Sequence, residues 1–362
     1  LTKLSYDIVP KAMEEVLQGK NDVVNQNLSE GKTYFSKEYT DDCESKLNDE
    51  YVSKQIENYL LNKKHLDEGV INVKPNLFDK HMKILKNEYA PITFEEWNEA
   101  IKNDDDVSDR VLVTFDDGYK DVINYGAEIL DKHNLDGIWF INGGMVNNDK
   151  VFWLSQLMYL YDNNYLDNFL NEFNLDFPGL LKPINLNNLP VKDVDMWAKD
   201  NYSKTLDESL NKYILGLGWN EMIEANRNSI YANSKELKTL SESFVIGNHT
   251  LSHPNFRNLS IEDKIKESEE SRNILENIID KKINTFAFPF GQEHFHWCQN
   301  DVNILQNLNY DFIFSVANNI DRTNTDVIHR HEILEFDGSE FKTFLNDLHN
   351  DWSDNLWLGE NR

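Results

Sequence analysis

The sequence predicts an α/β protein, in the form of a distorted or incomplete (β/α) barrel with a helical insertion. Three observations predict it. Short apolar runs that favour strands alternate with amphipathic segments from residue 70 to about 340. The runs are continuously apolar, as in "VLVTF", which is typical of strands buried on both faces of a parallel sheet. Between about residues 151 and 235 the alternation gives way to an Asn- and Leu-rich, helix-like stretch, which we interpret as the insertion.

The barrel begins with a strand near Val70, a turn at Pro75 and a helix that places Phe78, Met82 and Leu85 on one face. An apolar run over 111–115 predicts a strand that ends on an Asp-Asp-Gly turn. Ser260, with Asp263 three residues on, has the spacing of a helix N-terminal capping box. The remaining expected elements are helices over 120–133, 260–280 and 301–308, and strands over 137–141, 244–247, 284–291, 312–316 and 326–333.

The segments outside the barrel are less regular. Residues 1–69 are charged and are expected to form a helical and loop segment, such as the tail of another domain. The barrel is expected over 70–340, and residues 341–362 are expected to be a C-terminal tail.

Composition excludes several function classes. The net charge of -27 opposes approach to nucleic acid or to an anionic membrane. The two cysteines, Cys43 and Cys298, form no metal-binding or disulfide pattern. No apolar run is long enough for a transmembrane helix, and no signal peptide is visible, which favours a cytoplasmic location. The chain does not begin with Met, however, and can be partial. The oligomeric state is not predicted.

Two motifs carry the candidate chemistry. Asp116 and Asp117 follow a predicted strand, where α/β folds place their sites, and His249 and His253 lie four residues apart. One carboxylate and two imidazoles give three ligands with an open position, as in catalytic zinc sites, and the second carboxylate could serve as general base. Both aspartates reach one site only if the strand ends at Asp116, which Gly118 permits. The alternatives are a polar turn that caps the next helix and a chance histidine pair.

The motifs "TFDDG", "HTLSH" and "FAFPFG", in this order, resemble the first three motifs of the polysaccharide deacetylase, or NodB-type carbohydrate esterase, family. The resemblance covers roughly residues 70–334 and implies the deacetylase type of barrel. It implies Asp116 as general base, and the backbone N–H of Phe290 as an oxyanion donor. It also implies a divalent metal, most often Zn²⁺, with the ligands Asp117, His249 and His253.

This sequence departs from the family pattern in three places. Ala287 stands where many members have an Arg that positions the base. Trp297 is only a loose candidate for the fourth motif. For the general acid, "IHRHEI" offers His331 and His329, but it also resembles a subgroup that would align Arg330 and leave the acid unassigned.

Several aromatic side chains near predicted strand ends could stack on sugar rings, although core packing is the favoured role for most of them. They are Trp139, Phe140, Phe288, Phe290, Phe295 and Trp297. His294 and His296 lie beside them, but nothing in the sequence connects this pair with the proposed metal site.

The predicted function is therefore a metal-dependent hydrolase that removes an N-acetyl group from a sugar. One alternative is a deformylase of a formamido sugar, because "MEEVLQGKNDVVNQNLSEGKTYFSKEY" faintly resembles the tail of a formyltransferase domain. A second is a non-catalytic carbohydrate-binding relic, because the motif Arg is missing. A third is a hydrolase of a non-sugar amide, which the same fold would tolerate.

Overall fold

The structure of the chain is a computed structural model that describes residues 2–5, 73–103, 105–107, 110–148, 150–186, 189–218, 230–316, 326–333 and 336–354. Eight parallel strands form one sheet in the order β1-β8-β7-β6-β5-β4-β3-β2. Their bounds are β1 (Thr2–Ser5), β2 (Ala90–Pro91), β3 (Arg110–Phe115), β4 (Gly137–Ile141), β5 (Val245–Asn248), β6 (Thr285–Ala287), β7 (Phe312–Val316) and β8 (Ile328–Glu332). The predicted α/β class is confirmed.

Seven of these strands close into a distorted barrel. Strand β1 pairs with β8 on one side and with β3 on the other, so the sheet returns on itself, and β2 lies outside the ring beside β3. The contact between β5 and β6 is the weakest, since only Asn248 and Phe286 are paired in register. A ring of seven strands with one thin contact matches the predicted distorted (β/α) barrel.

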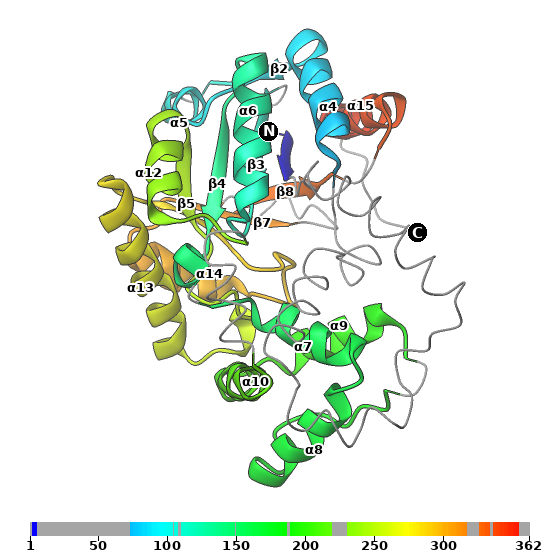
Figure 1. The fold of residues 1–362 in the computed structure, drawn as a ribbon. Helices are drawn as coiled ribbons and strands as arrows, with labels where there is room; N and C mark the ends of the chain where they lie inside the picture. Colours follow the sequence, from blue (N-terminus) through cyan, green and yellow to red (C-terminus); the bar gives the residue numbers. More distant parts are fainter. Residues whose placement is uncertain are drawn as a thin grey trace, which may run out of the picture.

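Helices surround the barrel (Figure 1). They are α4 (Pro75–Glu88), α5 (Phe94–Lys102), α6 (Lys120–His133), α12 (Ser234–Ser243), α13 (Ile261–Ile279), α14 (Gln299–Asn307) and α15 (Gly338–Asp354). Helix α4 begins with Pro75 at its first position, where a missing N–H costs nothing. Helix α13 is capped by Ser260, whose hydroxyl accepts from the backbone N–H of Asp263, as its spacing predicted. None of the described helices is long and apolar enough to cross a membrane.

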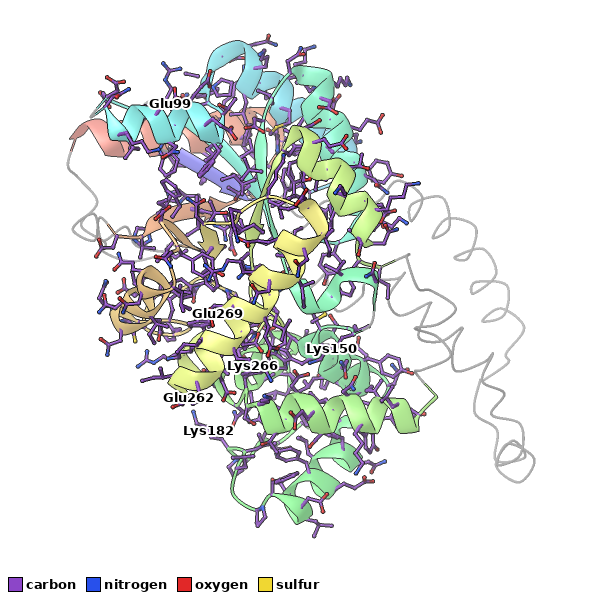
Figure 2. The ribbon with its side chains drawn as sticks, turned by 90° about the vertical axis from the view of Figure 1, so that its left-hand side faces the viewer. Glu99, Lys150, Lys182, Glu262, Lys266 and Glu269 are labelled. Atoms are coloured by element: carbon purple, nitrogen blue, oxygen red, sulfur yellow. The ribbon has the colours of Figure 1, made fainter. Side chains whose placement is uncertain are left out.

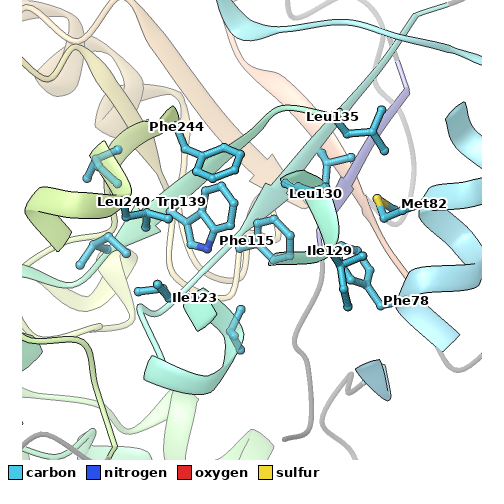
Figure 3. Packing of buried hydrophobic residues seen from close by; sticks show 14 of the residues in the cluster. Phe78, Met82, Phe115, Ile123, Ile129, Leu130, Leu135, Trp139, Leu240 and Phe244 are labelled. Atoms are coloured by element: carbon cyan, nitrogen blue, oxygen red, sulfur yellow. The ribbon is translucent and has the colours of Figure 1, made fainter. Parts of the chain in front are cut away.

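The main core lies between the strands and helices α4, α6 and α12 (Figure 3). Phe78 and Met82 of α4 are fully buried, as the one-face pattern predicted. The Phe115 ring of β3 stacks on Trp139 of β4 with ring centroids 4.5 Å apart. Because burial of a large apolar side chain contributes about 2 to 3 kcal/mol, this layer holds the strand ends in fixed positions.

The insertion forms a helical layer with a core of its own. It contains α7 (Trp153–Asp162), α8 (Leu166–Asp176), α9 (Val191–Asp200) and α10 (Lys204–Gly216), preceded by the short helix η2 (Gly143–Asn148). Leu157, Leu206 and Leu210 are fully buried in this second core. The layer lies at the end of the barrel where the β4 arrow points (Figure 1). The predicted helical nature of the insertion is therefore confirmed for the described residues.

Four expectations need correction. Residues Thr2–Ser5 form barrel strand β1 rather than part of a separate segment. Residues Gly338–Asp354 form a helix, and Phe341 and Leu345 enter the main core, so this part of the chain is not a tail. The strand beside β3 is Ala90–Pro91, which is too short for any periodicity to reveal. The expected strand over 284–291 is a strand only over Thr285–Ala287. Residues 70–72 lie outside the described residues.

Candidate active site

The Asp-Asp-Gly turn brings two carboxylates to one end of the barrel. Strand β3 ends at Phe115, and the backbone then turns sharply, with φ of 72° at Asp117 and 81° at Gly118. The N–H of Gly118 donates to the carbonyl oxygen of Asp116 at 2.9 Å. Regular strand geometry is therefore lost at once, and neighbouring side chains no longer point to opposite faces. The condition under which both aspartates reach one site is met.

The two histidines come from the loop after β5. Thr250 and His253 both have left-handed backbone angles, with φ of 71° and 57°. The backbone N–H of His253 donates to the Thr250 hydroxyl at 3.1 Å, and the N–H of Thr250 donates to the Asn248 side chain at 3.0 Å. Non-glycine residues seldom adopt this conformation, and such strain clusters at functional sites. Here it occurs in both site loops.

Glu267 of α13 fixes the same loop from behind. One of its carboxylate oxygens accepts from the backbone N–H groups of Leu251 and Ser252 at 3.0 and 2.8 Å, and the other accepts from the Ser252 hydroxyl at 2.8 Å. On the other side, the backbone of η2 approaches closely, and Gly144 donates to the carbonyl oxygen of Leu251 at 3.0 Å. A Cβ atom on Gly144 would lie only 2.4 Å from that oxygen, so glycine is required.

Asp117, His249 and His253 form the one cluster of potential metal ligands found among the described residues. Their ligand atoms all lie within 4.8 Å of one another. The Asp117 Oδ1 atom lies 3.5 Å from Nε2 of His249 and 3.3 Å from Nε2 of His253. Both imidazole nitrogens therefore face the same carboxylate oxygen.

The chemistry of this donor set fits a divalent cation. Nδ1 of His249 donates to the carbonyl oxygen of Ala287 at 2.8 Å, which assigns the ring proton to Nδ1. Burial lowers the pKa of His249 and lowers the pKa of His253 well below its usual value, so both rings are neutral. Nε2 of His249 then presents a lone pair toward a carboxylate oxygen, and a cation between the two would stabilise them. A hydrogen bond from the far nitrogen is also how proteins orient metal-ligating histidines.

Asp116 is held by a buried arginine. Arg330 of β8 donates from both terminal nitrogens to the two carboxylate oxygens of Asp116, at 2.6 and 2.7 Å. Burial acts to raise the pKa of Asp116, but the charge of Arg330 and its hydrogen bonds to the carboxylate outweigh it and hold the pKa below its usual value. Arg330 has no exposed surface, whereas the Asp116 side chain is 18% exposed. The arrangement keeps Asp116 ionised and accessible.

Arg330 supplies the positive charge beside Asp116, because position 287 carries Ala and not Arg in this sequence. Ala287 is fully buried in β6, in one apolar cluster with Phe140 and Phe314. The Arg330 guanidinium lies 5.1 Å from the centre of the Phe140 ring. The charge beside Asp116 thus comes from β8 rather than from β6. The alignment of Arg330 with a functional position, which the sequence left open, agrees with this geometry.

His329 and His331 do not face the site. They flank Arg330 in β8, and because alternate strand residues point to opposite faces, they lie on the side away from Asp116. Nδ1 of His329 is 2.9 Å from the Ser315 hydroxyl, and the His331 ring packs edge-on against Phe344. Burial lowers the pKa of His331 to about 4. The structure therefore argues against either histidine as the general acid.

Glu332 lies on the same face of β8 as Arg330, two residues further on. The residue is exposed, yet desolvation around its carboxyl group raises its pKa. Arg330 and Lys199 oppose this rise, and Asp116 adds to it. A second carboxyl group is therefore near Asp116, and no sequence motif singles it out.

The Phe290 ring lies beside His253. Its ring centroid is 4.6 Å from that of His253, and Lys199 of the insertion lies 4.8 Å from the ring centre. Its backbone has φ of 59°, another left-handed value in a bulky residue. The His296 ring lies 5.3 Å from Phe290, so one member of the second histidine pair does lie near the site.

The insertion reaches the site at several points. The indole N–H of Trp153 donates to the carbonyl oxygen of His253 at 2.8 Å, and the Phe152 ring lies 4.8 Å from the His253 ring. At the other end of the insertion, residues 230–232 hydrogen-bond to the Asp-Asp-Gly turn and to the start of α6. The backbone N–H of Lys120 donates to the carbonyl oxygen of Ile230, and the backbone N–H of Ala232 donates to the carbonyl oxygen of Gly118. The insertion therefore braces both site loops.

Part of the chain matches a known protein family. Residues 205–313 match the family model described as polysaccharide deacetylase. The resemblance to this family is confirmed. The match contains the HTLSH and FAFPFG motifs with β5 and β6, ends at the start of β7, and does not include the Asp-Asp-Gly turn.

One solved deacetylase structure supports the same fold, and two others are similar at lower TM-scores. The Streptococcus pyogenes deacetylase PplD, in complex with acetate, is similar with a TM-score of 0.50 and 15% identity, over 78% of this chain and 92% of that chain. IcaB from Ammonifex degensii has a TM-score of 0.48 and 13% identity, over 77% of this chain and 90% of that chain. The Bacillus cereus polysaccharide deacetylase BC0361 has a TM-score of 0.46 and 17% identity, over 76% and 62%. No curated protein matches the sequence significantly.

The sequence identifies the residues that converge in the site but not those that hold them. It presents Arg330 only as an alternative to two histidines, and nothing in it singles out Glu267 or Trp153. A signal for Arg330 does exist in the sequence, because a charged side chain in a strand that is buried must face a partner. Glu267 looked like an ordinary helix residue, since its partners are backbone groups that leave no mark in the sequence.

Proposed function

We propose that this protein is a metal-dependent carbohydrate N-deacylase that removes an acetyl group from an N-acetylated sugar. One observation carries the proposal. An ionised aspartate, held by a buried arginine, lies beside a second aspartate and two neutral histidines whose free nitrogens face one oxygen. Polysaccharide deacetylation is the activity that the matched family description names.

Asp117, His249 and His253 would hold the metal ion. When bound, such an ion supplies Lewis acidity that lowers the pKa of water and stabilises negative charge on a carbonyl oxygen. The chain's own contribution is geometric. The Ala287 carbonyl and the Glu267 carboxylate fix the two histidines, so that little ordering is needed when the ion binds.

Asp116 would accept the proton of the attacking water. Its low pKa keeps it unprotonated, and Arg330 holds both of its oxygens in a fixed plane. The backbone N–H of Phe290 would donate to the oxyanion that forms at the amide carbon. Because His329 and His331 are directed elsewhere, we assign protonation of the departing amine to Glu332, two residues beyond Arg330 on the same face of β8.

The test is the identity of the released acid. We expect purified protein with added Zn²⁺ to release acetate from N-acetylglucosamine oligomers, and to stop after treatment with EDTA. Asp116→Asn should lower kcat by roughly 10³-fold while zinc content stays the same, because the base is lost but the ligands remain. Formate release from matched N-formyl sugars, with no acetate release, would favour the deformylase.

Two further outcomes would overturn the proposal. Binding of zinc and sugar, with turnover that is absent or unaffected by Asp116→Asn, would indicate a binding relic. Hydrolysis of a non-sugar amide, with no release from any N-acyl sugar, would indicate the third alternative. The formyltransferase-like stretch over residues 13–39 lies outside the described residues.

A further inference from the structure

His296 lies near the site, and the proposed function gives its side chain no task. His294 is exposed, whereas His296 is half-buried, with its ring centroid 5.3 Å from that of Phe290. Burial and the charge of Lys199 lower the pKa of His296 to about 4, although a hydrogen bond with the Phe290 backbone acts in the opposite direction. The ring is therefore neutral near pH 7, and a neutral imidazole has one nitrogen that can accept a hydrogen bond.

The turn that carries Phe290 is strained and needs support from its surroundings. Phe290 and Gly291 follow one another with left-handed backbone angles, with φ of 59° and 70°. A bulky residue keeps this conformation only where the surrounding structure holds it. The carbonyl oxygen of Gly291 accepts from the backbone N–H of Val316 at 3.0 Å and from the indole N–H of Trp297 at 2.8 Å. These two bonds fix the middle of the turn.

His296 holds the end of the same turn, two residues after Phe290. The backbone N–H of Gln292 donates to Nδ1 of His296 at 3.2 Å, and the backbone N–H of His296 donates to the carbonyl oxygen of Gln292 at 2.9 Å. Only the first of these bonds depends on the side chain. It requires a lone pair on Nδ1, so the ring proton lies on Nε2.

His296 is also tied to the loop that carries His253. The carbonyl oxygen of His296 accepts from the backbone N–H of Arg257 at 2.8 Å. The Phe290 ring in turn lies 4.6 Å from the His253 ring. His296 thus connects the loop after β5, which would hold the metal ion, with the turn after β6, which would hold the oxyanion.

We propose that His296 is a positioning residue that fixes the direction of the Phe290 backbone N–H relative to the metal ligands. The inference rests on the proposed function and goes beyond it, because it assigns a task to a side chain that acts through another residue. An oxyanion donor is effective only when it points to the place where negative charge develops. Without the bond to Nδ1, the turn is free to relax from its left-handed angles, and the peptide plane that carries the N–H turns with it.

The test uses the zinc-loaded protein with two substitutions at this position. His296→Leu removes the acceptor and keeps a side chain of similar size, whereas His296→Asn places an oxygen where Nδ1 lies. We expect His296→Leu to lower kcat for N-acetylglucosamine oligomers about 10²-fold, with KM and zinc content unchanged, and His296→Asn to recover most of the loss. The matched control is His294→Leu, at an exposed position of the same loop with φ of 67°, which should leave kcat unchanged.

Affinity for a tetrahedral analogue separates positioning from a general loss of structure. The probe is the N-methylphosphonamidate of glucosamine, whose phosphorus carries a charged oxygen where the oxyanion would form. Calorimetric titration should show that His296→Leu weakens binding of this analogue by about the same 10²-fold, because only the tetrahedral form meets the Phe290 N–H at full strength. A merely structural role would raise KM and weaken analogue binding together.

Three results would overturn the inference. His296→Leu could leave kcat unchanged, or it could raise KM by as much as it weakens analogue binding. His296→Asn could also lose as much activity as His296→Leu, which would show that the acceptor for the Gln292 N–H is not what matters. Failure of the proposed function is seen instead in the unsubstituted protein, as an absence of both acetate release and analogue binding.

Discussion

The barrel and the insertion contribute to the site in different ways. The barrel supplies the groups with reactive chemistry, on loops that directly follow β3 and β5 and on β8. The insertion has its own core and supplies walls and braces, such as Trp153 against the His253 loop and Lys199 over Phe290. In Figure 2, the labelled Lys150 and Lys182 lie in the insertion layer, and Glu262, Lys266 and Glu269 mark α13 above it.

The difference follows from how each region fixes position. A parallel sheet sets the ends of its strands through hydrogen bonds and a shared core, so residues distant in sequence meet with little freedom. Helices that pack over a separate core fix one another's positions. They contact the barrel mainly at its site loops, so they do less to fix the positions of its residues. We therefore expect changes in the barrel to affect metal binding and kcat, and changes in the insertion to affect KM.

The largest expected effect tests the barrel half of this comparison. Asp117→Ala should abolish retention of zinc and activity, because it removes the oxygen that both imidazoles face. Zinc content after dialysis, measured by atomic absorption, checks it. The free energy of unfolding should fall by no more than about 2 kcal/mol, since alanine is disfavoured at a φ of 72°.

Asp117→Gly is the matched control for backbone strain. It should lose zinc equally but recover part of the stability, because glycine accepts a positive φ without cost. Global unfolding of both variants would show that the turn is part of the core, contrary to its position at the tip of a strand.

The next effect concerns pH. Asp116 must be unprotonated to act as a base, so activity is present above its pKa and is lost as pH falls through it. Because the charge of Arg330 helps to hold that pKa low, Arg330→Lys, which loses the paired geometry, should move the acidic limb of the kcat/KM profile to higher pH. We expect kcat to fall about tenfold at its plateau.

The free energy of unfolding should depend on pH with the same sign as the activity. A carboxyl group with a lowered pKa stabilises the folded state above its unfolded pKa, and this stabilisation is lost as pH falls through the folded value. Arg330→Lys should therefore weaken the fall in stability on acidification. An acidic limb that stays in place in the variant would remove Asp116 from the role of base.

A smaller effect is expected from the support behind the histidines. Glu267→Gln should weaken zinc affinity about tenfold, because one amide cannot accept all three of the hydrogen bonds that fix residues 251 and 252. The control is Glu262→Gln on the exposed side of the same helix, labelled in Figure 2. Competition with a chromophoric zinc chelator gives both affinities, and equal values would show that the loop holds itself.

The smallest effect tests the insertion half. Trp153→Phe keeps an aromatic ring but leaves the His253 carbonyl without the indole donor, at a cost of about 1 kcal/mol. We expect KM for an N-acetylated oligosaccharide to rise a few-fold, with kcat and zinc content nearly unchanged. A loss of kcat larger than the rise in KM would mean that the insertion sets the reactive geometry as well, and the division between the two regions would fail.

Much of the fold could be predicted, because the sequence patterns that indicate helices and strands lie within a few neighbouring residues. The run over 111–115 and the helix over Lys120–His133 appear as expected, since apolar periodicity and strand-favouring residues act within a few positions. The residues of the donor set could also be predicted, because they are carboxylates and imidazoles at strand ends. In contrast, β1 and the two-residue β2 carry almost no local pattern, and their places depend on pairing with β3.

The sequence by itself determined the alternation of strands and helices, the insertion, and the residue types that could hold a metal ion. Only the tertiary structure decided which face of β8 points inward, and so that Arg330 meets Asp116 while His329 and His331 turn away. The reason is physical. Alternation tells which residues share a face, but the closed register of the barrel tells which face is inside, and that register depends on pairings between strands far apart in the chain.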